Sequence, residues 1–122
     1  MKHNPGFLKL VDDAKARVKQ IDIERYKKMA AAGEAHVLVD TREDNGWAAG
    51  HVAGAVHLSR GIIERDIETQ YPDKAATLVL YCGGGYRSAL VVESLQKMGY
   101  TGAISLDGGW RALKESGLPL EK

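Results

Sequence analysis

The chain has 122 residues, of which 44% are hydrophobic and 27% are charged, and this length suits one globular domain with a single core. Its 17 lysines and arginines nearly cancel its 16 aspartates and glutamates, which gives no support for a nucleic-acid or membrane-surface role. The first residues are charged and lack the apolar segment of a secretory signal, and no apolar run reaches the roughly 20 residues that span a bilayer. We therefore predict a soluble, cytoplasmic protein that binds neither nucleic acid nor membrane.

The N-terminal region has the pattern of an amphipathic helix. Its apolar residues recur at spacings of three and four, with charged residues between them: Phe7, Val11, Ala14, Val18 and Ile21. Residues 1–19 are expected to form a helical extension, and residues 20–122 a single domain. The apolar stripe is expected to pack on that domain, with the binding of a partner protein as the alternative. It carries no group that the chemistry discussed below requires.

The remainder of the chain alternates short apolar runs with helical patterns. Asp22 can cap a short helix that Gly33 ends. The apolar runs predict buried strands at residues 36–40, 55–58, 77–81 and 103–106, and the helical patterns lie at residues 61–70, 88–98 and 109–116. This alternation predicts an α/β domain with a mainly parallel sheet and helices on both faces.

The single cysteine, Cys82, lies in the segment YCGGGYRSALVV at residues 81–92, where a predicted strand ends and a helix begins. Ligands of open parallel sheets bind beyond the carboxyl ends of the strands. The three glycines at 83–85 allow backbone amides to turn inward, and the helix start and Arg87 add positive charge. Each feature favours a thiolate over a thiol and can also bind an anionic substrate. The alternative is a buried structural cysteine beside a flexible turn.

The sequence argues against a cofactor, a metal ion or an internal redox partner. A Walker-type phosphate loop needs Lys and then Ser or Thr after its last glycine, and the dinucleotide motif needs Gly or Ala where Ser88 stands. His51 and His57 are the only close pair of histidines, and no further cysteine completes a ligand set. A lone cysteine also has no resolving thiol in the same chain.

Four motifs in register resemble those of the rhodanese family, and the chain is similar to a single-domain rhodanese over about residues 20–117. The motifs are DTRE (40–43), WAAGHVAGAVHL (47–58), the loop CGGGYR (82–87) and LDGGW (106–110). The resemblance implies a three-layer domain with a mainly parallel central sheet of about five strands, helices on both faces, and the N-terminal helix as an extension.

The resemblance also implies a reaction, the transfer of a sulfane sulfur through a persulfide on Cys82. The donor would be thiosulfate or a polysulfide, and the acceptor a thiol, cyanide or a protein. Substrate contacts are expected from the loop and from one more distant arginine: Gly83, Gly84, Gly85, Tyr86, Arg87, Ser88 and Arg60. For Arg60, a surface salt bridge is the alternative role. Asp40 and Arg42 are expected to support the site by joining loops through charge-assisted hydrogen bonds.

Two other functions remain open from the sequence. A phosphatase or an arsenate reductase can share this fold, but the six residues from Cys82 to Arg87 match the loop of the sulfur enzymes, and the dual-specificity phosphatases have one residue more. An arsenate reductase could not use an internal resolving cysteine. A non-catalytic docking domain is the third reading, and Cys82 argues against it because inactive relatives usually lack that residue.

Overall fold

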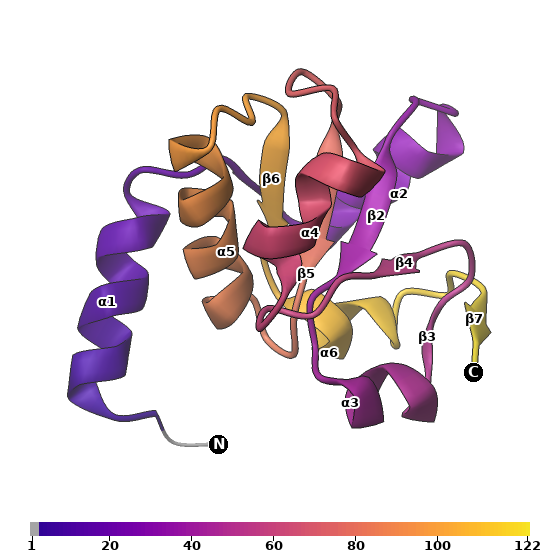
Figure 1. The fold of residues 1–122 in the computed structure, drawn as a ribbon. Helices are drawn as coiled ribbons and strands as arrows, with labels where there is room; N and C mark the ends of the chain where they lie inside the picture. Colours follow the sequence, from indigo (N-terminus) through magenta and orange to yellow (C-terminus); the bar gives the residue numbers. More distant parts are fainter. Residues whose placement is uncertain (1–2) are drawn as a thin grey trace.

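A computed structural model describes residues 3–122, which form an α/β domain around a five-stranded sheet (Figure 1). The strand order is β1-β6-β5-β2-β4, and every neighbouring pair is parallel. The strands are β1 (Gln20–Ile21), β2 (Val37–Asp40), β4 (Val56–His57), β5 (Leu78–Tyr81) and β6 (Ala103–Leu106). The predicted α/β fold with a mainly parallel sheet of about five strands is confirmed.

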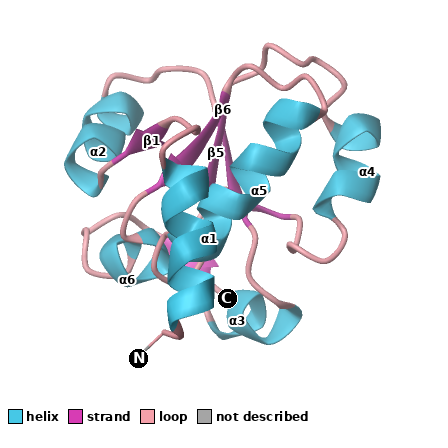
Figure 2. Cartoon of the chain, turned by 90° about the vertical axis from the view of Figure 1, so that its left-hand side faces the viewer, coloured by secondary structure: helices cyan, strands magenta, loops and turns pink. Residues whose placement is uncertain are grey.

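Helices cover both faces of this sheet (Figure 2). They are α2 (Ile23–Ala31) and α6 (Gly109–Leu113) on one face, and α4 (Ile63–Gln70) and α5 (Tyr86–Lys97) on the other. Strand β5 shows why both faces are apolar: Leu78 and Leu80 pack toward α4 and α5, whereas Val79 and Tyr81 pack toward α2 and α6. Such a strand reads as a continuous apolar run, as the sequence predicted.

Local signals explain where the helices begin and end. The Asp22 carboxylate accepts a hydrogen bond from the Arg25 amide at 2.8 Å, as an N-cap does at the start of α2. Gly33 and Gly99, just beyond α2 and α5, have the positive φ angles expected after a helix. Among residues 3–122, no helix combines the length and the apolar character needed to cross a bilayer.

The N-terminal helix α1 (Pro5–Lys15) packs against α5, outside the two helical layers (Figure 2). Val11 and Ala14 are fully buried against Ala89 and Leu90 of α5. The helix is shorter than the apolar stripe predicted, because Ile21 belongs to β1 and pairs with Leu106 of β6. Placing Ile21 in the helix was therefore wrong, since pairing with the sheet edge overrides the helical spacing.

Besides β1, the structure contains three short elements that the sequence did not predict. Helix α3 (Asp44–Ala49) leads into β3 (His51–Val52), and β3 pairs in antiparallel fashion with β7 (Leu120–Glu121) near the C-terminus. Two-residue strands carry no recognisable alternation, and this pair joins residues nearly 70 positions apart. Together these elements form the end of the molecule toward which the parallel strands point (Figure 1).

Candidate active site

Cys82 lies directly beyond the carboxyl end of β5, and only 2% of the residue is exposed. The amide of Gly85 donates to its Sγ at 3.2 Å, and the amide of Ser88 does so at 3.3 Å. As a thiol, Cys82 donates to the Ser88 hydroxyl at 3.5 Å. Both backbone donors are aimed at the same sulfur atom, in the arrangement of an anion-binding turn.

A buried pair of hydroxyls extends this contact. The Oγ atoms of Ser88 and Ser105 are 2.8 Å apart, and both residues are fully buried. If Cys82 is a thiolate, the Ser88 hydroxyl can donate to the sulfur while it accepts the hydroxyl proton of Ser105. The side chain of Ser88 therefore contacts the reacting sulfur from within the protein and does not line the pocket.

Helix α6 holds the active-site loop in place. The amides of Trp110 and Arg111 donate to the carbonyls of Cys82 and Gly83 at 2.7 and 3.0 Å. This approach is so close that a Cβ on Gly109 would lie 2.5 Å from the Cys82 carbonyl oxygen. Gly85 has a φ of 93°, and a Cβ there would lie 2.9 Å from the Gly108 amide nitrogen. The glycines of the LDGGW motif thus allow α6 to contact the loop.

Other amides of the loop remain available to a substrate. Within the part of the chain that the structure describes, the N–H groups of Gly83, Gly84, Tyr86 and Arg87 donate to no protein acceptor. They lie at the start of α5, where the helix dipole is positive. An anion bound beside Cys82 could therefore accept hydrogen bonds without displacing existing ones.

The guanidinium of Arg87 forms a bidentate ion pair with Glu43, at 2.7 and 3.1 Å. Hydrogen bonds from Arg87 lower the pKa of Glu43 to about 2, and the same contact raises the pKa of Arg87. The Glu43 carboxylate therefore offsets the positive charge of Arg87, which the sequence analysis expected to bind the substrate. Glu43 is the fourth residue of the DTRE motif, and its spacing in the sequence does not relate it to Arg87.

Arg60 contacts the loop from outside the pocket. Its guanidinium donates to the Arg87 carbonyl at 3.3 Å, and the side chain does not line the space above Cys82. The structure therefore brings Arg60 to the back of the loop. A direct contact with substrate would require the side chain to move.

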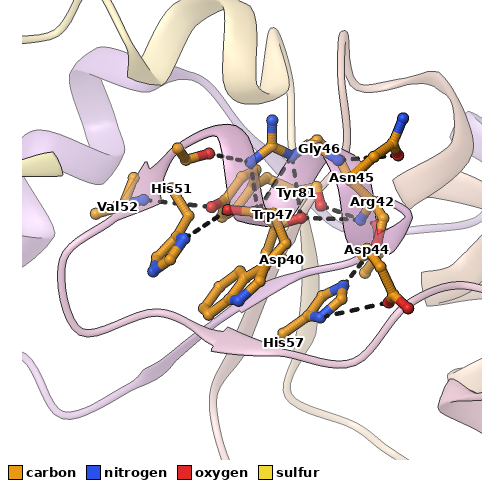
Figure 3. A network of polar contacts seen from close by, with 12 residues as sticks. Asp40, Arg42, Asp44, Asn45, Gly46, Trp47, His51, Val52, His57 and Tyr81 are labelled. Atoms are coloured by element: carbon orange, nitrogen blue, oxygen red, sulfur yellow. Dashed lines mark hydrogen bonds and ion pairs between the residues drawn. The ribbon is translucent and has the colours of Figure 1, made fainter. Parts of the chain in front are cut away.

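Asp40 and Arg42, which are both buried, belong to a network of polar contacts (Figure 3). Arg42 donates to both carboxylate oxygens of Asp40, at distances from 2.8 to 3.1 Å, and to the Gly50 carbonyl at 2.6 Å. Its guanidinium also lies 4.4 Å from the ring centre of Trp110 in α6. Burial, and then the neighbouring Asp40 carboxylate, raise the pKa of Tyr81. The network thus joins β2, the turn at Gly50 and the helix that holds the loop.

The two neighbouring histidines stack on an aromatic ring. The ring centroid of Trp47 lies 3.4 Å from that of His51 and 4.9 Å from that of His57, and its plane is nearly parallel to both rings (Figure 3). The His51 Nδ1 and the Trp47 carbonyl oxygen are 2.8 Å apart. In residues 3–122, no group of three or more potential ligands gathers in a way that could hold a metal ion.

A pocket of about 380 Å³ opens above Cys82. The loop supplies part of its lining: Cys82, Gly83, Gly84, Tyr86 and Arg87. The rest comes from Arg111 of α6 and from two N-terminal residues, His3 and Phe7. Sequence reasoning missed these three, because nothing in their spacing relates them to the loop. A larger groove of about 710 Å³ runs along α2 and contains none of the predicted site residues.

The family model for the rhodanese-like domain matches residues 22–116. The chain belongs to the rhodanese-like domain family. This rhodanese-like domain is 33% identical over 93 residues to the thiosulfate sulfurtransferase GlpE of Pseudomonas entomophila (strain L48), a match covering 74% of this chain and 84% of that one. The resemblance seen in the four motifs is confirmed, and relatives of this domain are named as sulfurtransferases.

Solved structures agree on the fold. A rhodanese-like domain protein from Staphylococcus aureus superposes with a TM-score of 0.75 and 28% identity, over 86% of this chain and all of that one. A protein from Rhodopseudomonas palustris CGA009, described as a possible tyrosine phosphatase of unknown function, superposes with a TM-score of 0.85 and 26% identity. That match covers 99% of this rhodanese-like domain and 98% of the other chain, so it includes the N-terminal helix that the family model leaves out.

Proposed function

We propose that this protein is a sulfurtransferase that carries a sulfane sulfur as a persulfide on Cys82. The observation that carries the proposal is the convergence of the Gly85 and Ser88 amides on Sγ, beneath a pocket with further unused amides. Relatives named as thiosulfate sulfurtransferases support the class of reaction. Cys82 acts as the nucleophile, the amides of Gly85 and Ser88 hold its sulfur, and the amides of Gly83, Gly84, Tyr86 and Arg87 bind the donor.

In the first half-reaction, the Cys82 thiolate attacks the outer sulfur of a donor such as thiosulfate. A new S–S bond forms to Sγ, and the S–S bond of the donor breaks with its electron pair leaving on sulfite. One thiolate and one thiosulfate dianion thus give one persulfide anion and one sulfite dianion. The amides of the loop stabilise the charge on the departing sulfite and on the persulfide.

In the second half-reaction, a nucleophilic acceptor removes the outer sulfur of the persulfide. Cyanide forms thiocyanate, and a thiolate forms a new persulfide on a small molecule or on a protein. In each case the Sγ–S bond breaks with its electron pair returning to Cys82 as thiolate. No second cysteine of the chain is required, which suits a protein with a single one.

Phosphatase activity is the second candidate, because the name of the Rhodopseudomonas palustris protein points to it. The same amides could hold a phosphate group while the thiolate attacks phosphorus. Against it stands the short loop, in which Gly85 and Ser88 already lie within 3.3 Å of Sγ. A phosphate is wider than one sulfur atom, and its in-line attack is sensitive to small errors of position.

The test compares thiosulfate:cyanide transfer and aryl-phosphate hydrolysis by the native protein and by Cys82→Ser. We expect sulfur transfer by the native protein, none by the variant, and no appreciable hydrolysis by either. The variant should keep the native unfolding midpoint, because serine replaces one atom of a buried side chain. Transfer that persists in Cys82→Ser would refute the proposal, and robust hydrolysis by the native protein would favour the phosphatase.

A further inference from the structure

The N-terminal segment forms one wall of the pocket above Cys82. His3 and Phe7 line this pocket, although both lie outside the residues that the family model matches. Their rings meet the ring of Tyr86 from the loop, with centroids 4.4 Å apart for His3 and 6.3 Å apart for Phe7. In both overall views the N-terminal end of α1 lies at the same end of the molecule as α3 and α6 (Figures 1 and 2).

This wall is firmly attached to the domain. Below Phe7, the buried Val11 and Ala14 continue the contact with α5. The guanidinium of Arg17 donates to the Glu93 carboxylate at 2.7 Å. The wall is therefore part of the packed structure rather than a loose segment that happens to lie near the pocket.

The size of the pocket exceeds what an inorganic anion requires. Its volume of about 380 Å³ falls in the range of roughly 300–1,000 Å³ typical of sites for organic ligands. Thiosulfate would need only the donors of the loop and would leave the aromatic wall of His3, Phe7 and Tyr86 unused. Aromatic side chains stabilise apolar and aromatic groups that pack against them.

The charge of the pocket points in the same direction. Of its two arginines, Arg87 is paired with Glu43. Arg111 is exposed, and no carboxylate of the described residues forms an ion pair with it. One uncompensated arginine beside an aromatic wall suits a singly charged anion with an apolar body better than the small thiosulfate dianion.

We infer that the N-terminal wall selects an organic, singly charged sulfane-sulfur donor of the thiosulfonate type. The sulfane sulfur would lie at Cys82, the sulfonyl oxygens near the loop amides and Arg111, and the organic group against His3, Phe7 and Tyr86. The inference rests on the proposed sulfur transfer. The step balances: the thiolate attacks the terminal sulfur, the S–S bond of the donor breaks, and a sulfinate leaves with the electron pair.

Two donors with the same reacting group test this inference. Benzenethiosulfonate has an aromatic body, and methanethiosulfonate has only a methyl group. The ratio of their kcat/KM values, with cyanide as acceptor, therefore measures the contribution of the wall to the recognition of the organic group. We expect the native protein to prefer the aromatic donor on the order of tenfold, the effect of good aromatic contacts. Phe7→Ala and His3→Ala should each lower this ratio, and Phe7→Leu, which keeps an apolar side chain at that position, should lower it less than Phe7→Ala.

Leu10→Ala is the matched control, because Leu10 is on the same helix, is 53% exposed and does not line the pocket. It should leave the ratio unchanged. A native ratio near one would overturn the inference. So would a Phe7→Ala variant that slows both donors equally, because that result indicates a general loosening of α1.

A second measurement separates this inference from the proposed function. Benzenesulfinate and methanesulfinate are the leaving groups of the two donors and need no turnover to bind. Each is tested for protection of Cys82 against alkylation. Stronger protection by benzenesulfinate that is lost in Phe7→Ala would support the wall even if no donor were turned over, and would then reject only the sulfur transfer. Equal protection by both sulfinates would overturn the wall even if thiosulfate were a good substrate.

Discussion

The active-site loop has two supports of different character. On its inner side lie the backbone bonds from α6 and the Asp40–Arg42 pair, in which Asp40 is fully buried and Arg42 is 8% exposed. On its outer side lies the Glu43–Arg87 pair, whose side chains are 67% and 38% exposed. The DTRE motif supplies Asp40 and Arg42 of the inner pair and Glu43 of the outer pair. The inner pair faces the core, and the outer pair faces solvent.

This difference separates the position of the sulfur from the nature of the entrance. A buried ion pair is costly to break, because the remaining charge stays out of water without a partner. An exposed pair is screened and contributes little to stability. The inner side therefore determines where Cys82 lies, and the outer side determines the charge that an arriving substrate meets.

The largest effect is expected from Asp40→Asn, which leaves the Arg42 guanidinium buried without its carboxylate. We expect the free energy of unfolding to fall by about 3–5 kcal/mol, as measured by chemical denaturation. The double variant with Arg42→Met removes both charges and should recover part of this loss. If the single variant lost less than about 1 kcal/mol, the inner pair would be no different from an exposed one.

A smaller effect on stability is expected from Gly109→Ala, which tests the contact between α6 and the loop. Gly109 has a φ of 50°, and its new Cβ would meet the Cys82 carbonyl oxygen at 2.5 Å. The left-handed conformation alone should cost about 1–2 kcal/mol. Displacing the loop should also reduce sulfur transfer on the order of 100-fold, because the reacting atoms lose their alignment.

Gly117→Ala provides the matched control for that variant. Gly117 also has a positive φ, of 88°, but a Cβ there would meet no atom within 4 Å. It should therefore show the conformational cost without the loss of transfer. Equal transfer rates in the two variants would indicate that α6 does not position Cys82.

The smallest effect is expected from Glu43→Gln, which breaks the outer pair. The pKa of Glu43 is lowered to about 2, so its stabilising effect is present above the ordinary glutamate pKa of about 4.3 and is lost as the pH falls through about 2. At pH 7 the variant should lose at most about 1 kcal/mol, because the pair is exposed. The loss should shrink between about pH 4 and pH 2.

Denaturation at several pH values measures this difference between Glu43→Gln and the native protein. Glu64→Gln gives the baseline, because Glu64 is exposed on α4 and the described residues contain no ion-pair partner for it. Glu43→Gln should also lower the KM for thiosulfate, because it frees the positive charge of Arg87 from its ion pair. A pH-independent fall of several kcal/mol in the free energy of unfolding would contradict this account, because it would mean that the Glu43–Arg87 pair stabilises the fold as a buried pair does.

The sequence predicted the features that neighbouring residues determine. Cys82, its glycines and Arg87 lie within one loop. The strand before it was visible as a continuous apolar run, and the helix after it as a helical apolar pattern. Asp40 and Arg42 stand two positions apart in one motif, and the structure pairs them and joins Arg42 to the Gly50 carbonyl. Ile21 was assigned to a helix because its spacing fits one, and the parallel partner that draws it into β1 lies 85 residues away.

What the sequence missed depends on contacts between distant segments. His3 and Phe7 reach the pocket only because α1 packs along α5, and no spacing in the sequence predicts that direction. Glu43 neutralises an arginine 44 positions away. Arg111 lines the pocket because glycines 108 and 109 let α6 approach the loop. In each case the residue type was visible, but its partner was not.

The most direct test of the central claim is the intact mass of the protein after incubation with thiosulfate and removal of the donor. We predict a gain of one sulfur atom on the native protein, reversed by cyanide with release of thiocyanate, and no gain on Cys82→Ser. The gain should map to the peptide that contains Cys82. A native protein that transfers sulfur without any such gain, or an equal gain on Cys82→Ser, would contradict the persulfide on Cys82.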